Sequence, residues 1–307
     1  MNQFDTIILG AGPAGLTAGI YLSRAKRKVV VIDKGIPGGQ MVLTHEVANY
    51  PGFENISGYM LSMNMKKQAE LFGAKVISNA SIKEVQLEGK TKTVTLTNGE
   101  VYSAPSFIVA TGGRSRQLGV TGESDFTGRG ISYCATCDGD FFTGKEIIVV
   151  GGGNTALEEA VALTTYAKKV TVVHQFAQWQ AFNSAIQEME ENPAIDAIME
   201  SRIVEFRGNE KLQEVVIEHI PSGSTYVKPI DGVFVFIGYV PNTEYFKGIL
   251  DLNQWGEIVV NDGLQTSIKG VYAAGDSIVK RYRQITTAVS DGTIAALNVA
   301  EFLNSIE

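Results

Sequence analysis

The chain has 307 residues, of which 44% are hydrophobic and 19% charged, and its formal net charge is −7 at pH 7. This length exceeds what one hydrophobic core normally covers, so two domains of ordinary size are expected. The negative charge argues against nonspecific nucleic-acid binding, and no apolar run approaches the roughly 18 residues of a membrane span. The N-terminus lacks the basic start of a secretory signal, and two cysteines do not make a disulfide scaffold, so we expect a cytoplasmic protein.

The first predicted element is a buried strand over Thr6–Leu9, which leads into Gly10-Ala11-Gly12-Pro13-Ala14-Gly15 and a helical pattern. This is the G-x-G-x-x-G turn of dinucleotide-binding folds, with a strand before it and a helix after it. The first glycine permits a tight turn, the second lets the backbone approach a pyrophosphate, and the third lets the helix pack on the strand. The residues predicted to bind a dinucleotide at this helix N-terminus are Gly10, Gly12, Pro13, Ala14 and Gly15.

A second strand, Lys28–Ile32, ends at Asp33. This acid lies close to the roughly 20 positions after the first glycine at which the motif places an acceptor for ribose hydroxyls. We therefore predict that Asp33 binds the ribose of the dinucleotide. The alternative interpretation is an ordinary solvated acid at the end of a strand.

A long loop follows, rich in turn-forming residues, from Gly38-Gly39-Gln40 to Asn49-Tyr50-Pro51-Gly52. Long loops in compact domains are often functional, so this loop is a candidate part of a binding site. Ser62–Phe72 is then predicted to be a helix with Lys66, Lys67 and Glu70 on its solvent face.

Two alternating segments, Ala80–Leu87 and Thr91–Leu96, predict antiparallel strands, and Asn98-Gly99 predicts a hairpin turn. The apolar run Phe107–Ala110 ends at Thr111-Gly112. At such a strand end we expect the backbone to approach a ligand.

Cys134 and Cys137 are the only cysteines, and they lie in Cys134-Ala135-Thr136-Cys137-Asp138-Gly139. Two thiols this close can form a disulfide, and one can lower the pKa of the other. Because the thiolate is the attacking species in thiol–disulfide exchange, we predict a redox-active dithiol. A structural disulfide is disfavoured, since so short a loop removes little entropy from the unfolded chain.

A zinc site is the other interpretation of two cysteines at this spacing, and it would need further ligands. The histidines available for it are His45, His174 and His219. They are far apart in the sequence and lack metal-binding spacing, so no metal is predicted.

A second strand–turn–helix unit begins at Glu146–Val150 and continues through Gly151-Gly152-Gly153-Asn154-Thr155-Ala156. The next strand, Val170–Val173, ends at His174, where the first unit has Asp33. After a helical region, further strands are predicted at Ile203–Glu205, Val215–His219 and Gly232–Ile237. The order of elements repeats that of the first half, so this is a second βαβ unit with a β-meander.

The last segment returns to the first pattern, with a strand over Gly270–Asp276 and a helix over 284–303. The predicted fold is therefore α/β, with two Rossmann-like dinucleotide-binding domains, the second inserted into the first, each with a β-meander. The predicted boundaries are 1–114 and 243–307 for the first, discontinuous domain, and 115–242 for the second, which carries the cysteine pair.

The motifs Gly10–Gly15, Thr111-Gly112, Cys134–Cys137, Gly151–Ala160 and Ala273–Asp276 together resemble the low-molecular-weight flavin thioredoxin reductases, over essentially the whole chain. The resemblance implies FAD in the first domain, thioredoxin as a partner, and a homodimer. The residues that it implies for FAD binding are Gly10, Gly12, Gly15, Gly39, Gln40, Asn49, Asp276, Arg283 and Gln284. It also implies that Cys137 faces the flavin, that Cys134 attacks the substrate disulfide, and that Asp138 is the general acid–base.

One segment departs from the family. In the family, the strand matching Val170–Val173 is followed by a His-Arg-Arg motif and a further Arg, which bind the 2′-phosphate of NADPH. Here these positions read His174-Gln175-Phe176-Ala177-Gln178-Trp179-Gln180. Losing three charge-assisted contacts of roughly 1.5–3 kcal/mol each weakens binding by at least about three orders of magnitude. No acid replaces them at the strand end, so a change to NADH is not indicated. Trp179 is interpreted as a core residue or as a plug of the vacated pocket, with a partner surface as the alternative.

A member without this phosphate site resembles the branch of the family that takes electrons from ferredoxin, so ferredoxin is the expected donor. A basic surface would suit a small acidic donor. The two basic runs available are Arg24, Lys26, Arg27 and Lys28, and Lys280, Arg281 and Arg283. Ordinary solvated surface is the alternative interpretation of each run.

Three further functions stay open on the sequence alone. One is an NADPH-dependent thioredoxin reductase with a non-standard phosphate site. Another is an oxygen-coupled oxidase of small dithiols, and the third is a flavin-bearing interaction module with inert cysteines.

Overall fold

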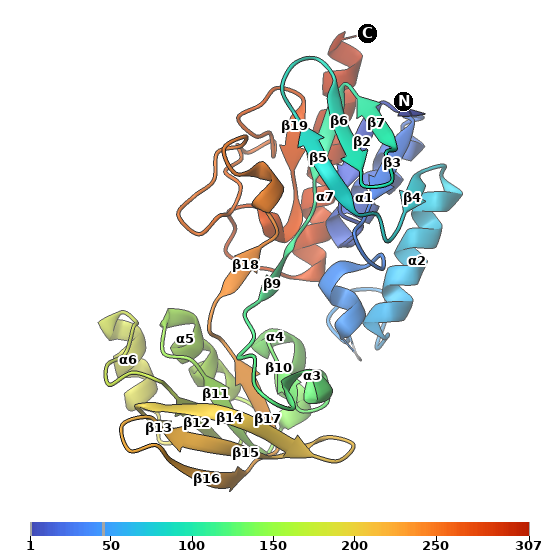
Figure 1. The fold of residues 1–307 in the computed structure, drawn as a ribbon. Helices are drawn as coiled ribbons and strands as arrows, with labels where there is room; N and C mark the ends of the chain where they lie inside the picture. Colours follow the sequence, from blue (N-terminus) through green and yellow to red (C-terminus); the bar gives the residue numbers. More distant parts are fainter. Residues whose placement is uncertain (1, 45–46, 307) are drawn as a thin grey trace. The chain divides into compact units, whose positions relative to one another are not determined.

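The computed structural model describes residues 2–44 and 47–306 of the chain. The chain folds into two units, and the second is inserted into the first (Figure 1). Unit 1 comprises Met1–Arg114 and Val240–Glu307, and unit 2 comprises Ser115–Tyr239. The strands at the two crossings, β9 (Gly113–Ser115) and β18 (Tyr239–Pro241), pair as a two-stranded sheet.

The second crossing falls between Tyr239 and Val240 rather than at the predicted position 242/243. Asn242 belongs to unit 1 because its backbone N–H donates to the Gly112 carbonyl at 2.9 Å. The Thr111 hydroxyl donates to the Asn242 carbonyl at 2.7 Å, which holds the returning chain at the end of a unit 1 strand.

Unit 1 is built on a five-stranded parallel sheet in the order β19-β8-β2-β3-β4. Its strands are β2 (Thr6–Leu9), β3 (Val29–Ile32), β4 (Lys75–Ile77), β8 (Ser106–Val109) and β19 (Val271–Ala273). Every residue of β2, β3, β8 and β19 is buried. Such continuous apolar strands are typical of a parallel sheet covered on both faces.

The helices of unit 1 are α1 (Pro13–Arg24), α2 (Gly58–Leu71) and α7 (Ile285–Ile306), with short 3-10 turns η1 (Gly39–Leu43), η3 (Glu244–Phe246) and η4 (Gly275–Ser277). Helix α2 starts earlier than predicted, because the Ser57 hydroxyl caps it by accepting the Met60 N–H at 3.2 Å. Helices α1 and α7 lie in close contact, since a Cβ on Gly292 would stand 2.2 Å from the Ala14 carbonyl oxygen.

A second sheet of unit 1 has the order β1-β7-β6-β5 and includes the predicted meander. Its strands are β1 (Asn2–Gln3), β5 (Ile82–Gln86), β6 (Lys92–Leu96) and β7 (Val101–Ala104). The turn predicted at Asn98-Gly99 joins β6 to β7, with Gly99 at φ 88° and its N–H donating to the Leu96 carbonyl.

Unit 2 repeats this design. Its parallel sheet has the order β10-β17-β11-β12-β13, and three antiparallel strands, β14-β15-β16, form the meander (Figure 1). The parallel strands are β10 (Ile131–Ser132), β11 (Glu146–Val150), β12 (Lys169–Val173), β13 (Ile195–Ile198) and β17 (Gly232–Val235), and the meander strands are β14 (Ser201–Gly208), β15 (Leu212–His219) and β16 (Ser224–Pro229). The helical elements are α3 (Glu123–Phe126), α4 (Ala135–Asp138), η2 (Gly139–Phe142), α5 (Asn154–Leu163) and α6 (Asn183–Glu190).

Alternate residues of β11 serve two hydrophobic clusters. Ile147 and Val149 pack with the helices, whereas Ile148 and Val150 pack with the meander. The period-2 geometry of a strand thus places one face of the sheet against α5 and the other against β14–β15. The predicted α/β fold with two Rossmann-like units, one inserted into the other, is confirmed.

Candidate active site

Cys134 and Cys137 form a disulfide, with their Cα atoms 5.3 Å apart. Cys134 is extended and precedes the single turn α4, which carries Cys137. The Cys134 carbonyl accepts the N–H groups of Cys137 and Asp138, both at 3.3 Å. Both cysteines are half-buried, so the pair sits at the surface of unit 2 without being fully solvated.

The residues that follow the pair fix it to the unit 2 core. Gly139 lies so close to α5 that an added Cβ would stand 3.1 Å from atoms of Leu163 and Tyr166. Phe142, at the end of η2, packs edge-to-face on Phe234 of β17 with ring centroids 5.2 Å apart. The dithiol turn is therefore held between the sheet and α5.

Asp138 is the titratable group next to the disulfide. Burial raises its pKa above the ordinary value, while a hydrogen bond from Ser132 opposes that rise and the charge of Asp140 adds to it. The Ser132 hydroxyl lies 2.5 Å from the Asp138 carboxylate. Sequence reasoning missed Ser132, because a serine two residues before a cysteine belongs to no motif.

The glycines of the first turn have different surroundings. A Cβ on Gly10, whose φ is 109°, would stand 2.1 Å from the Ala110 carbonyl oxygen, and one on Gly15 would stand 1.9 Å from the Gly10 carbonyl oxygen. A Cβ on Gly12 would meet nothing within 4 Å, and one on Gly39 would approach only the Gly12 Cα, at 3.4 Å. Gly10 and Gly15 are thus required by the fold itself, whereas Gly12 and Gly39 border open space.

Asp33 is tied to the same turn. One carboxylate oxygen accepts the Ala11 N–H at 2.6 Å, and the other accepts the Gly35 N–H at 2.8 Å. The long loop is pinned there too, since the Gly38 N–H donates to the Ala11 carbonyl at 2.7 Å. Asp33 therefore supports the turn, and its contact with a ribose stays a prediction.

Other predicted ligand contacts come from distant parts of the sequence. The Asn49 side-chain amide donates to the Gln284 side chain at 3.4 Å, so these two residues meet. Gln40 is exposed in η1, next to Gly39. The carbonyl groups of Thr111 and Gly112 accept hydrogen bonds from Asn242. A Cβ on Gly112 would meet nothing within 4 Å, so open space lies beside this residue.

A cluster of charges surrounds Asp276 at the start of the last segment. One Asp276 carboxylate oxygen is buried without a hydrogen-bond partner and lies 3.9 Å from the Lys280 ammonium. Lys280 is closer to Asp291, at 2.5 Å, and Arg283 pairs with Glu257. Burial raises the pKa of Asp276 to about 6, although the charges of Lys280 and Arg283 lower it.

These pairs correct the interpretation of the second basic run. Lys280 and Arg283 are largely buried and neutralised by acids of their own unit, which leaves Arg281 as the exposed cation of that run. A docking surface needs exposed charge, so this run does not supply one.

The first basic run is exposed but lies away from the glycine turn. Arg24 stands over the Phe72 ring at 5.4 Å, and Lys28 stands over the Phe4 ring at 4.8 Å. Arg24 is the last residue of α1 and Lys28 follows the helix, whereas the turn precedes its N-terminus. The 12 residues of α1 separate the two sites by roughly 18 Å.

The second glycine turn is in contact with the segment 174–180, which follows β12. His174 packs against Gly152, where a Cβ would stand 2.2 Å from its ring, and stacks on Trp179 at 5.3 Å. The Gln180 N–H donates to the Gly152 carbonyl at 2.7 Å, so the chain folds back over the turn. Trp179 is half-buried and packs against the hydrophobic cluster that contains residues of α5, which agrees with its interpretation as a core residue.

Burial lowers the pKa of His174, while its contact with the Gln178 carbonyl opposes that change. The imidazole is therefore neutral at pH 7 and adds no positive charge to this strand end. Gln175, Phe176 and Gln180, at which the sequence resemblance leads us to expect arginines, are exposed and uncharged.

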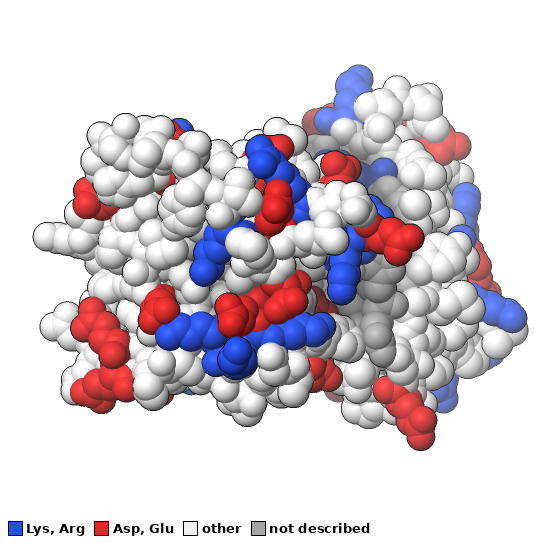
Figure 2. All heavy atoms as spheres, turned by 90° about the horizontal axis from the view of Figure 1, so that it is seen from below, with Lys and Arg blue, Asp and Glu red and all other residues white. Residues whose placement is uncertain are grey.

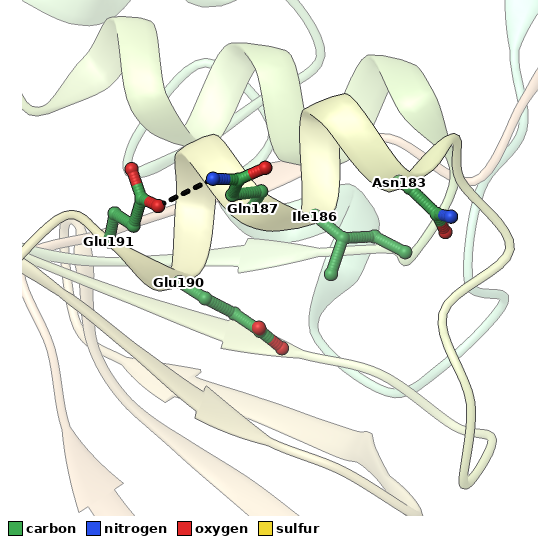
Figure 3. Close-up of a pocket in the computed structure, with 5 residues that line it drawn as sticks. All are labelled: Asn183, Ile186, Gln187, Glu190 and Glu191. Carbon is green, nitrogen blue, oxygen red and sulfur yellow. Dashed lines mark hydrogen bonds between the residues drawn. The ribbon is translucent and has the colours of Figure 1, made fainter.

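Unit 2 has ion pairs and a surface hollow outside the dithiol turn. Basic and acidic side chains lie next to one another on the face in Figure 2. Unit 2 contains the ion pairs Arg202–Glu218 and Arg207–Glu205. Figure 3 shows an open hollow along α6, where Gln187 bonds to Glu191 at 2.7 Å. The residues lining this hollow are Asn183, Ile186, Gln187, Glu190 and Glu191.

Among residues 2–44 and 47–306, no group of three or more His, Cys, Asp or Glu side chains could hold a metal ion. His45 lies outside the described residues, His174 is packed in the core, and His219 bonds to Ser222 at 2.8 Å. Within the same ranges, no helix is long and apolar enough to cross a membrane.

Comparisons with known proteins identify the family. The profile of the family described as pyridine nucleotide-disulphide oxidoreductase matches residues 4–292. The chain belongs to this family.

Relatives within the family are similar over nearly the full length. The thioredoxin reductase of Peptoclostridium acidaminophilum is 42% identical over 311 residues, which cover 99% of this chain and 98% of the relative. That of Bacillus subtilis is 42% identical over 305 residues, with 99% and 96% covered. The crystal structure of thioredoxin reductase from Streptococcus pyogenes has a TM-score of 0.95 at 41% identity and 99% coverage of both chains. The chain is thus a disulfide reductase of the thioredoxin reductase type, and the cofactor of these flavoproteins is FAD.

Unit 1 fits FAD in three respects. Gly12 and Gly39 leave open space at the N-terminus of α1, where a pyrophosphate is favoured. The buried Asp276 oxygen without a hydrogen bond can accept one from a ligand hydroxyl. Asn49 and Gln284 lie together, so two amides from distant segments can contact the same ligand.

Proposed function

We propose that this flavin-dependent disulfide reductase reduces thioredoxin and receives its electrons from ferredoxin rather than from NADPH. The family membership supports the disulfide chemistry, and relatives at 42% identity are thioredoxin reductases. The donor is inferred from the segment after β12. The proposal also includes a homodimer located in the cytoplasm.

The dithiol chemistry follows from the cysteine pair. The Cys134 thiolate attacks one sulfur of the thioredoxin disulfide, whose S–S bond breaks as a mixed disulfide forms. Cys137 then attacks Cys134, which re-forms the disulfide seen in the structure and releases reduced thioredoxin. Asp138 moves protons between the cysteine thiols and the leaving thiolates, so two electrons and two protons pass to thioredoxin.

Bound FAD would supply the two electrons that reduce the Cys134–Cys137 disulfide, since a flavin can accept electrons one at a time and release them as a pair. In the proposal, Cys137 is the sulfur that faces the cofactor. The residues proposed to hold FAD are Gly10, Gly12, Pro13, Ala14, Gly15, Asp33, Gly39, Gln40, Asn49, Thr111, Gly112, Asp276, Arg283 and Gln284.

One observation carries the choice of donor: the strand end that would face the 2′-phosphate of NADPH carries no positive charge. Residues 174–191 contain no Lys or Arg, and His174 is buried and neutral. Arg202 follows Ser201, whose N–H donates to the His174 carbonyl, but its guanidinium pairs with Glu218 at 2.7 Å. A dianionic phosphate finds no charge-assisted partner among these groups.

The test is a thioredoxin reduction assay under anaerobic conditions with each electron donor in turn. Reduced ferredoxin should produce thioredoxin thiols, and NADPH or NADH at the same concentration should not. Efficient turnover with micromolar NADPH would contradict the donor assignment and leave the disulfide chemistry in place. Peroxide release from an added small dithiol in air, with no thioredoxin reduction by any donor, would favour the oxidase alternative.

A further inference from the structure

Ser132 joins the two parts of the dithiol turn. It is 5% exposed and ends β10, two residues before Cys134. Its hydroxyl oxygen accepts the Cys134 backbone N–H at 3.1 Å and stands 2.5 Å from Oδ2 of Asp138. The Cys134 carbonyl lies farther from the hydroxyl, at 3.3 Å, so the single hydroxyl proton is directed to the carboxylate.

The support for Ser132 is rigid. Strand β10 pairs in parallel with β17, and Ser132 stands opposite Phe234 in that pairing. Phe234 in turn packs on Phe142, which follows the dithiol turn. The backbone of Ser132 is therefore held by the sheet next to the dithiol turn.

The other titratable groups around Asp138 do not replace this contact. Asp140 in η2 repels the Asp138 carboxylate and raises its pKa. The Tyr133 hydroxyl points to Glu123, to which it donates at 2.9 Å. Helix α5, which packs against α4, brings Glu158 and Glu159, and burial raises the pKa of Glu159. Ser132 is the one neighbour that lowers the pKa of Asp138.

We propose that Ser132 is a positioning residue for disulfide exchange, whose hydroxyl holds the Asp138 carboxyl group and links it to the backbone of the attacking Cys134. This inference rests on the proposed function of the dithiol. Asp138 first holds the proton that Cys134 gives up, and passes it to the first leaving thiolate as the thioredoxin S–S bond breaks. Asp138 then takes the proton of the Cys137 thiol and passes it to the second leaving thiolate as the mixed disulfide breaks, so the two protons of the dithiol end on reduced thioredoxin.

The predicted effect has a direction. The Ser132 hydroxyl stabilises the ionised carboxylate, so its removal raises the pKa of Asp138. A reaction that needs the protonated acid slows as pH rises through that pKa. In Ser132→Ala the alkaline limb of the pH profile therefore moves to higher pH, and the maximal rate falls about tenfold or more because the carboxyl group is less well placed.

The experiment uses the full-length protein as Ser132→Ala, Ser132→Thr and Asp138→Asn variants. One readout is the pKa of Asp138, followed by carbon NMR of the labelled carboxyl group, with Asp138→Asn identifying the signal. The second is the pH profile of thioredoxin reduction. Ser132→Thr keeps the hydroxyl, so its pKa and its limb should match those of the unmodified protein.

An unchanged Asp138 pKa in Ser132→Ala would overturn the proposal, as would a rate lowered equally at every pH. A shift of the same size in Ser132→Thr and Ser132→Ala would also overturn it, since the hydroxyl would then be irrelevant. The NMR readout needs no turnover. If the protein does not reduce thioredoxin but the Asp138 pKa rises in Ser132→Ala, the proposed function is wrong and the coupling of Ser132 to Asp138 is retained.

Discussion

Two glycines of the first turn are expected to have different roles, Gly15 in the stability of the fold and Gly12 in cofactor binding. A methyl group on Gly15 would lie 1.9 Å from the Gly10 carbonyl oxygen, so Gly15→Ala should lower the free energy of unfolding by about 2–4 kcal/mol. A methyl group on Gly12 would meet no protein atom within 4 Å but would enter the path of a pyrophosphate.

We therefore expect Gly12→Ala to keep the stability of the apoprotein and to lose at least about tenfold in FAD affinity. Thermal unfolding of both apoproteins and fluorescence titration with FAD measure the two effects. Equal FAD affinity in Gly12→Ala and the unmodified protein would remove Gly12 from the cofactor site.

Asp276 predicts a pH dependence of the apoprotein's stability. Burial raises its pKa to about 6 in the folded chain, above the ordinary value of 3.8, so the folded state binds the proton more tightly than the unfolded state. This group therefore lowers the free energy of unfolding as pH rises from about 4 to about 6. Above pH 6, its ionised form lowers the free energy of unfolding by on the order of 1–3 kcal/mol.

In Asp276→Asn, apoprotein stability should exceed that of the unmodified protein at pH 8 and match it at pH 4. FAD affinity should fall about tenfold to hundredfold, because a buried hydrogen bond to a charged acceptor is lost. Asp251→Asn, at an exposed acid of the same unit, is the matched control. Lower stability of Asp276→Asn at pH 8 would show that the buried carboxylate is satisfied by the protein alone.

At the scale of elements, the segment after β12 is the part on which the proposed electron donor depends. Gln175, Phe176 and Gln180 in this segment are exposed, so arginines placed there meet no steric obstacle from the core. The combined variant Gln175→Arg, Phe176→Arg and Gln180→Arg should gain NADPH affinity by about three orders of magnitude, through charge-assisted bonds to the 2′-phosphate.

Equilibrium titration with NADPH measures this gain. A control with the same added charge, Gln213→Arg, Ser224→Arg and Thr225→Arg at exposed positions of the meander, should bind NADPH as weakly as the unmodified protein. If the first variant binds NADPH no more tightly than the control, arginines at these three positions are not sufficient for a 2′-phosphate site, and the prediction is wrong.

The sequence predicted elements well where a pattern repeats over several residues. Strands β2 and β11 occur at the predicted residues, because continuous β-branched apolar runs beside glycine turns leave few alternatives. Strand β16 was missed, since its exposed side chains show no alternation between buried and solvated positions. The start of α2 was missed because the cap at Ser57 depends on one hydrogen bond.

The candidate site residues were chosen from motifs, such as Gly12 in the glycine turn and Cys134 in the cysteine pair, and their roles stay predictions. The burial of Lys280 against Asp291 could not be predicted from the sequence, because those acids and bases meet only after α7 folds onto η4. Ser132 shows the same limit, since its role depends on a hydroxyl that points at Asp138.

At the scale of the whole molecule, one design is used twice with different outcomes. Both units have a parallel sheet, a glycine turn before a helix, and a meander. In unit 1 the turn borders open space at Gly12 and Gly39, and one buried carboxylate oxygen of Asp276 has no hydrogen-bond partner within the protein, which suits a bound ligand. In unit 2 the same turn is packed beneath a neutral histidine and carries the dithiol on a neighbouring element. The second turn packs its strand and helix together, and under the proposed function it binds no NADPH.

The most direct test is the absorbance of the bound flavin after rapid anaerobic mixing with reduced ferredoxin or with NADPH. The structure and sequence predict that reduced ferredoxin bleaches the flavin and that NADPH at micromolar concentration leaves it oxidised. Rapid bleaching by micromolar NADPH would contradict the central claim that the second nucleotide fold no longer binds its phosphate.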